Sequence, residues 1–192
     1  MKNLVILIAL VFSFFSHASQ PSVQLVPLED LELVEYLLDK AERLSGLATQ
    51  RRDLIPPIYA ISKADMSKTV CPEDPGNCRN LAAVFDDLGY RILYLDDFEI
   101  SQNFKPYDYS FLIHELIHWL QYMNYGAEIF NGCDKIYETE FFAYQAQDKY
   151  LAEEGAFERV GNFFRFSFAC DEKIAQKEYA ESKQVWDQRQ TP

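Results

Sequence analysis

Apolar residues recur at every third or fourth position along LEDLELVEYLLDKAERL, from Leu28 to Leu44. This spacing places them on one face of a helix, and Gly46 supplies a stop signal just beyond it. Two prolines in RRDLIPPI interrupt the helical pattern, and the apolar residues that follow predict a short strand from Ile58 to Ser62. This part of the chain therefore predicts one amphipathic helix followed by one strand.

Two runs rich in β-forming residues come next, LAAVFDD at 81–87 and YRILYLDDF at 90–98. Asp87, Leu88 and Gly89 lie between the runs and favour a turn. The two runs therefore predict a hairpin that ends the sheet.

The stretch FLIHELIHWLQYM, residues 111–123, is apolar at almost every position and predicts a buried helix. We expect this helix to begin at Asp108 or Tyr109. A second helix is predicted over 134–153, closed by Gly155.

The remaining C-terminal part has a weaker pattern. NFFRFSFAC at 162–170 alternates partly between aromatic and polar residues, and 173–189 has the pattern of a polar, weakly amphipathic helix. With 192 residues, the chain is long enough for one domain with a core and short for two. Helices combined with a small sheet predict an α+β domain.

Residues 1–18 have the composition of a secretory signal peptide. Lys2 is followed by the apolar run LVILIALVFSFF, and small residues stand at positions −3 and −1 of a cut after Ala18. The run is too short for a stable membrane span; an uncleaved anchor is the alternative interpretation. We therefore expect an exported protein, periplasmic or secreted, with a single domain at 19–192.

Acidic residues outnumber basic ones by 30 to 18, which gives a formal net charge of −12. A surface this acidic disfavours binding to nucleic acid or anionic lipid. Four cysteines fit an oxidising compartment. Cys71 and Cys78 bracket the turn PEDPGN, so we pair them in a disulfide and leave Cys133 with Cys170. A zinc knuckle is the competing interpretation, but the cysteine spacing does not match one.

The apolar helix carries His114, Glu115 and His118, three polar groups that are costly to bury without partners. Histidines four residues apart share one helix face and can bind one metal ion, while Glu115 lies about 100° away from His114. This is the H-E-x-x-H pattern, in which the glutamate acts as general base beside a zinc ion. The alternative is a core helix whose histidines bond to backbone carbonyls. Against it, the one other histidine of the chain, His17, lies in the predicted signal peptide.

A catalytic zinc ion usually takes three protein ligands. No histidine remains for the third, which excludes the extended metzincin motif. A carboxylate from the helix at 134–153 is therefore expected. This pair of helices resembles that of the gluzincin zinc metallopeptidases, where a glutamate in a run E-F-x-A-D completes the site. Glu140 opens the similar run EFFAY, so the resemblance implies Glu140 as the third ligand, with Glu138 as the alternative.

The chain departs from this pattern at Tyr144, where relatives often have an aspartate that orients a ligating histidine. Tyr144, Glu138 or Asp108 would have to take over that hydrogen bond, unless Tyr144 only packs. By analogy with the family, an extended peptide is expected to add to an edge strand at Tyr90–Leu95. An oxyanion also needs a hydrogen-bond donor, and the candidates are Tyr107, Tyr109, Tyr122, Tyr125 and Arg165.

The resemblance implies a zincin-like minimal domain with a small, mainly antiparallel sheet packed on the helix that carries H-E-x-x-H. It implies an exported metallopeptidase that binds one Zn²⁺ through His114, His118 and Glu140. A peptide or protein substrate would be hydrolysed by a metal-activated water, with Glu115 as general base. The alternative is a catalytically inactive zinc-containing module that binds a peptide or cell-envelope partner. Glu115 favours the enzyme, because a purely structural zinc site does not need it.

Overall fold

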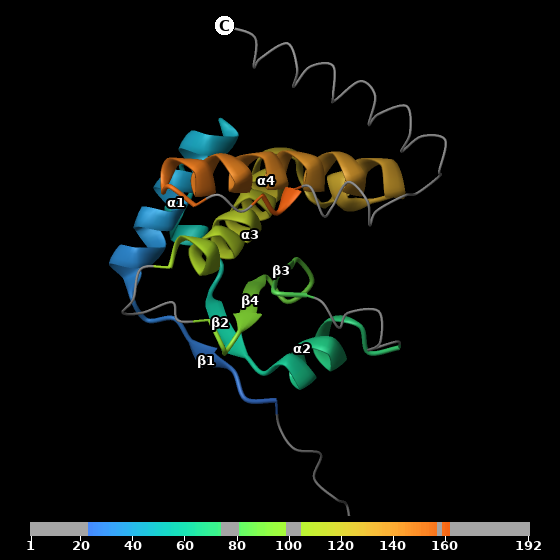
Figure 1. The fold of residues 1–192 in the computed structure, drawn as a ribbon. Helices are drawn as coiled ribbons and strands as arrows, with labels where there is room; N and C mark the ends of the chain where they lie inside the picture. The colour runs from blue at the N-terminus through green and yellow to red at the C-terminus, as the bar shows by residue number, and fades with distance from the viewer. Residues whose placement is uncertain (1–22, 74–80, 99–104, 157–158, 162–192) are drawn as a thin grey trace, which may run out of the picture.

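The structure, a computed structural model, describes residues 23–73, 81–98, 105–156 and 159–161. Within these ranges the chain forms four α-helices and a four-stranded mixed sheet, which confirms the α+β class (Figure 1). Across the same residues, no helix combines the length and the apolar character that a membrane span requires.

The elements follow one another in the order β1, α1, η1, β2, α2, β3, β4, α3, η2 and α4. The strands are β1 Val26–Pro27, β2 Ile58–Ile61, β3 Ala83–Asp86 and β4 Arg91–Leu95. The helices are α1 Leu31–Ser45, α2 Lys63–Val70, α3 Pro106–Tyr125 and α4 Cys133–Glu153. Two short 3₁₀ turns are η1 Arg52–Leu54 and η2 Ala127–Phe130.

The strand order in the sheet is β1-β2-β4-β3. β1 pairs with β2 and β3 pairs with β4 in antiparallel fashion, whereas β2 and β4 run parallel. The predicted hairpin with its turn near Gly89 is confirmed as β3 and β4. The expectation of an edge strand at Tyr90–Leu95 is wrong, because β4 lies between β2 and β3, and β3 forms the edge of the described sheet.

Side chains alternate across β4, so this strand contributes to two apolar clusters on opposite faces of the sheet. Ile92 and Tyr94 face the main core, which the helices α1, α3 and α4 complete. Leu93 and Leu95 face a smaller cluster closed by Met66 of α2. A central strand covered on both faces is apolar along its length, which explains the sequence RILYL.

The sequence did not predict α2. This helix is only eight residues long and is capped by Ser62, whose side chain accepts a hydrogen bond from the Asp65 N–H at 3.2 Å. Met66 is the one large apolar side chain that α2 buries, so the helix has no stripe of apolar residues to reveal it.

The predicted amphipathic helix is confirmed as α1, but it begins at Leu31 rather than Leu28. Asp30 caps it, because its carboxylate accepts a hydrogen bond from the Leu33 N–H at 3.0 Å. The N–H of Leu28 instead donates to the carbonyl of Ile58, next to the β1–β2 pair. Gly46 ends the helix with a left-handed φ of 74°, as the sequence predicted.

The buried helix α3 is confirmed and begins at Pro106, two or three residues before the predicted start at Asp108 or Tyr109. Proline is favoured at the first helical position because its missing N–H would have no intrahelical partner there. α3 contacts α1, α4, β3 and β4, and it lies between the sheet and α4 (Figure 1). This central place explains why α3 is apolar on nearly every face.

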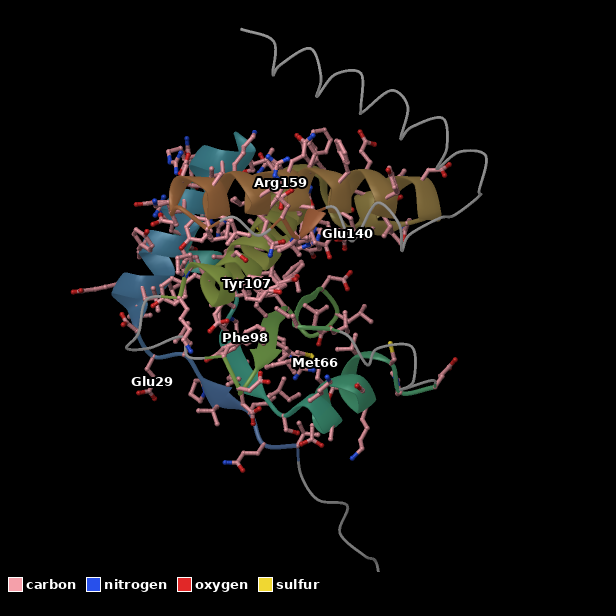
Figure 2. All side chains as sticks on the ribbon, viewed as in Figure 1. Glu29, Met66, Phe98, Tyr107, Glu140 and Arg159 are labelled. Atoms are coloured by element: carbon pink, nitrogen blue, oxygen red, sulfur yellow. The ribbon has the colours of Figure 1, made fainter. Side chains whose placement is uncertain are left out.

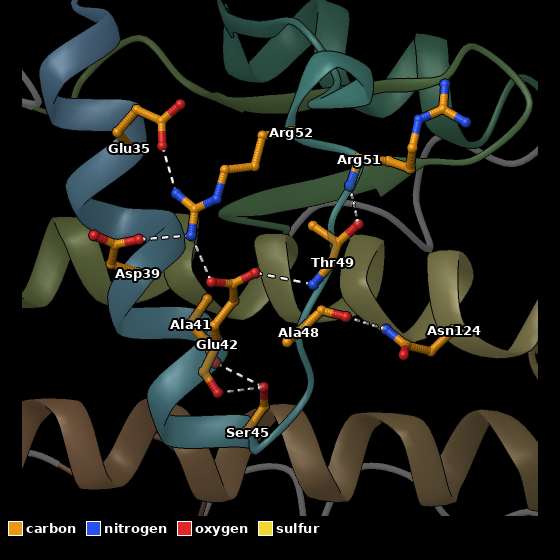
Figure 3. A network of polar contacts seen from close by, with 10 residues as sticks. All are labelled: Glu35, Asp39, Ala41, Glu42, Ser45, Ala48, Thr49, Arg51, Arg52 and Asn124. Carbon is orange, nitrogen blue, oxygen red and sulfur yellow. Dashed lines mark hydrogen bonds and ion pairs between the residues drawn. The ribbon is translucent and has the colours of Figure 1, made fainter.

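Ionic contacts hold the segment after α1 against that helix. The guanidinium of Arg52 contacts the carboxylates of Glu35, Asp39 and Glu42 at 2.5, 2.8 and 2.6 Å (Figure 3). The other oxygen of Glu42 accepts from the N–H of Thr49 at 3.0 Å. The turn η1, which precedes β2, is therefore fixed to the exposed face of α1.

Several predicted features fall outside the described residues. These are the signal peptide at 1–18 and the C-terminal segments at 162–170 and 173–189. Cys71 is disulfide-bonded, but Cys78 and Cys170 are not described. The pairings Cys71–Cys78 and Cys133–Cys170 therefore stay predictions.

Candidate metal centre

Both histidines and the glutamate of the H-E-x-x-H motif are buried in the middle of α3. Their exposed fractions are 5% for His114, 7% for Glu115 and 6% for His118. α4 packs against α3 (Figure 1) and carries Glu140, labelled in Figure 2, whose carboxylate lies close to both histidines. Polar groups buried this deeply need partners, and the structure gives a partner to each of them.

The ring nitrogens Nε2 of His114 and His118 lie 3.0 Å apart. The carboxylate of Glu140 lies beside both, with Oε2 at 3.2 Å from His114 Nε2 and Oε1 at 3.3 Å from His118 Nε2. These three residues each offer one ligand atom, and the atoms all lie within 4.8 Å of one another. The structure thus brings together the three residues that the sequence analysis predicted as ligands.

The separations fit a small cation with tetrahedral coordination. Zinc bonds of about 2.0–2.1 Å at tetrahedral angles would place neighbouring ligand atoms roughly 3.3 Å apart. Two imidazole lone pairs and a carboxylate that converge at about this distance repel one another unless a cation lies between them. A proton can reduce this repulsion, and so can a metal ion.

The other ring nitrogen of each histidine contacts a glutamine side chain. His114 Nδ1 lies 3.1 Å from the Oε1 atom of Gln147 on α4, and His118 Nδ1 lies 2.9 Å from the Oε1 atom of Gln121 on α3. Glutamines thus occupy the positions beside the two Nδ1 atoms for which the sequence suggested Tyr144, Glu138 or Asp108. An amide carbonyl can also accept the single N–H that each histidine offers here.

Glu115 is tied to the sheet rather than to the histidines. Its Oε2 accepts a hydrogen bond from the backbone N–H of Phe85 at 2.7 Å. Phe85 lies in β3, and this hydrogen bond fixes the glutamate against the edge strand. The contact places Glu115 between α3 and β3, beside the cluster formed by His114, His118 and Glu140.

Burial and neighbouring charges shift the pKa values of these groups. Burial raises the pKa of Glu115, although the two histidines partly oppose this. Burial lowers the pKa of His118, but the charge of Glu140 outweighs it and the result is a rise to about 9. Burial likewise raises the pKa of Glu140, yet His118 and His114 bring it well below its ordinary value. Without a metal, His118 and Glu140 therefore form a charged pair.

Aromatic rings border the cluster on two sides. The ring of Tyr144 packs edge-on against His114 with centroids 4.3 Å apart, and Phe130 contacts His118 in the same way at 6.0 Å. Burial raises the pKa of Tyr144, so its hydroxyl stays protonated. Tyr144 thus packs against a histidine, as one of the two interpretations of this residue predicted.

The predicted oxyanion donors are dispersed. Tyr109 is buried in the main core, and Tyr122 packs against Phe85 and Tyr90. Tyr107 packs against Phe111 near the start of α3 (Figure 2), and Arg165 lies outside the described residues. The structure selects none of them.

Glu138, the alternative third ligand, is exposed on a different face of α4 and does not join the cluster. It lines a cavity of about 680 Å³ between α1, α3 and α4, together with Tyr125 of the candidate donors. The cavity also touches Gln121 but none of His114, His118 and Glu140. Gln121 therefore separates this cavity from the cluster of His114, His118 and Glu140.

Sequence analysis missed two contributors to the site. Gln147 lies 33 residues from His114 along the chain, and the backbone N–H of Phe85 has no signature in the sequence. Gln147 follows Glu140 by seven residues, which is two helical turns, and this spacing would have placed it on the same face of α4.

Comparison of the chain with known protein families, with characterised proteins and with solved structures finds no match. The resemblance to the gluzincins therefore stays a prediction.

Proposed function

We propose that this protein is an exported, zinc-dependent metallopeptidase of the gluzincin type, built on a zincin-like domain. Its ligands are His114, His118 and Glu140, and its general base is Glu115. The observation that carries the proposal is the convergence of two imidazole nitrogens and a carboxylate at 3.0–3.3 Å. The donor set fits zinc, which takes histidine nitrogen and glutamate oxygen at its catalytic sites.

Two further features support an enzyme over a purely structural site. The described residues offer three protein ligands in this cluster, whereas a structural zinc site usually has four. A second acidic residue, Glu115, is also buried next to the ligands, and burial raises its pKa. A carboxylate with a raised pKa is suited to take and return a proton near neutral pH.

When bound, zinc would polarise the substrate carbonyl and make a water molecule acidic enough to attack it. The chain's own residues supply the proton transfers. Phe85 holds one oxygen of Glu115, which leaves Oε1 to take the proton from the attacking water. The water oxygen bonds to the carbonyl carbon and the C=O π electrons move onto the carbonyl oxygen. When the C=O double bond re-forms, the C–N bond breaks and Glu115 passes the proton to the leaving amine. β3, at the edge of the described sheet, lies beside this group.

The first test is the zinc content of the purified exported chain, measured with Glu140→Ala and Glu138→Ala. About one equivalent in the wild type, lost in Glu140→Ala and kept in Glu138→Ala, is the expected result. Glu138→Ala is the matched control because it removes a carboxylate two residues away, outside the cluster. Cleavage of a random peptide mixture, followed by mass spectrometry and absent in Glu115→Gln, is the second expected result.

The outcomes separate the two candidate functions. Zinc without cleavage would overturn the peptidase and favour the inactive zinc-containing module that binds a peptide or cell-envelope partner. A wild-type protein that binds no zinc would overturn both.

A further inference from the structure

We propose that Gln121 and Gln147 are positioning residues that fix both histidines for metal binding with neutral amides in place of a carboxylate. The inference deepens the proposed function and rests on the zinc site proposed there. Both glutamines are buried, with exposed fractions of 4% and 0%. Each contacts the Nδ1 atom of a different histidine.

The orientation of Gln147 follows from its hydrogen-bond partners. Its Nε2 group donates to the hydroxyl of Ser110 at 2.9 Å. That hydroxyl in turn donates its single proton to the carbonyl of Tyr107 at 2.6 Å, so it can only accept from Gln147. The amide oxygen of Gln147 must therefore face His114, and His114 Nδ1 must carry the proton.

The orientation of Gln121 follows in the same way. Its Nε2 group donates to the backbone carbonyl of Thr139 at 3.0 Å, and a carbonyl can only accept. The amide oxygen therefore faces His118 and requires a proton on His118 Nδ1. Because Thr139 lies on α4, this contact also fixes α4 to α3 one residue away from Glu140.

Both contacts have the same consequence for the histidines. With a proton on each Nδ1, each imidazole, in the neutral form that binds a metal, directs its Nε2 lone pair toward the other histidine and toward Glu140. The amides add no charge, whereas a carboxylate in their place would make the imidazole a stronger base and a tighter ligand. Replacing Gln147 by glutamate should therefore tighten zinc binding, and replacing it by alanine should weaken it.

The test measures the zinc dissociation constant of the full chain by competition with a chromophoric chelator. Loss of a partner of this kind typically costs 10–100-fold in metal affinity, so Gln147→Ala and Gln121→Ala should each weaken zinc binding by about that factor. Gln147→Glu should bind at least as tightly as the wild type. Gln145→Ala, which removes a glutamine from another face of α4, is the matched control and should leave the affinity unchanged.

Because a buried substitution can disturb folding and so weaken zinc binding indirectly, a second measurement observes the histidine protons directly. In the zinc-loaded wild type, the Nδ1 protons of both histidines should give exchange-protected resonances by NMR. Gln147→Ala should remove this protection for His114 and keep it for His118, which serves as an internal control.

The inference fails if Gln147→Ala binds zinc as tightly as Gln145→Ala, or if Gln147→Glu binds no better than Gln147→Ala. Unchanged exchange protection of the His114 proton in Gln147→Ala would also overturn it. A wild-type chain that binds zinc together with any of these results would refute the role of the glutamines and leave the proposed function intact. A wild-type chain without zinc would refute both.

Discussion

The buried hydrogen bond between the Phe85 N–H and Glu115 gives one residue two separable roles, in stability and in catalysis. Glu115→Gln keeps an oxygen that can accept from Phe85, whereas Glu115→Ala leaves this N–H without a partner. Both variants lose the general base. We therefore expect them to share one effect on turnover and to differ in stability.

The structure sets the size of the difference. A buried donor that loses its partner costs about 1–3 kcal/mol, and loss of the buried Cγ methylene adds about 1 kcal/mol. Both variants also remove the cost of burying the ionised carboxylate, so this contribution cancels between them. Glu115→Ala should therefore be less stable than Glu115→Gln by about 2–4 kcal/mol. For a chain of this length that difference lowers the melting temperature by roughly 5–15 °C.

The assay is thermal and urea unfolding of the wild type and both variants, each with zinc and with chelator. Peptide cleavage is measured on the same samples, and both variants should lose about 10²–10⁴-fold in kcat. Equal melting temperatures for the two variants would refute the structural role of the hydrogen bond. Turnover in Glu115→Gln within tenfold of the wild type would refute the role of Glu115 as general base.

Three further predictions concern the scaffold. Tyr150→Phe should leave the stability unchanged or raise it by about 1 kcal/mol in urea unfolding, because its buried hydroxyl has no hydrogen-bond partner in the described part of the chain; a loss above 1 kcal/mol would reveal a hidden partner. Tyr90→Phe should cost about 2–3 kcal/mol, since it removes the acceptor of the Trp119 indole N–H and the donor to the Leu54 carbonyl; an unchanged unfolding midpoint would contradict this. Arg52→Ala should cost about 1 kcal/mol at low salt, because exposed ion pairs contribute little, and clearly less in 0.5 M NaCl; a loss independent of salt would show that Arg52 acts through packing.

The parts of the fold that the sequence predicted correctly depend on neighbours along the chain. α1 is identified by the apolar period of 28–44, and α3 by the near-continuous apolar run of 111–123. In each helix the apolar residues that the pattern places on a face are the ones that are buried. The relative position of His114 and His118 was predictable in the same way. A spacing of four residues on a helix fixes it before any tertiary contact forms.

The order of the strands was not accessible in the same way. β2 pairs with β4 across about thirty residues, and the residues of neither strand indicate which other strand it pairs with. β4 could therefore be mistaken for an edge strand, although its apolar residues on both faces are typical of a central one. The short α2 was missed for a related reason, since its stability comes from one residue, Met66, in a cluster under the sheet.

Helical spacing alone places the two imidazoles and the glutamate beside them, because a helix converts sequence spacing into geometry. Their partners, in contrast, depend on tertiary packing. The packing of α4 on α3 brings Glu140 rather than Glu138 to the histidines and places Gln147 behind His114, while β3 supplies a backbone N–H to Glu115. These contacts span 22–33 residues of chain, and such distances close only when separate elements pack around a common core.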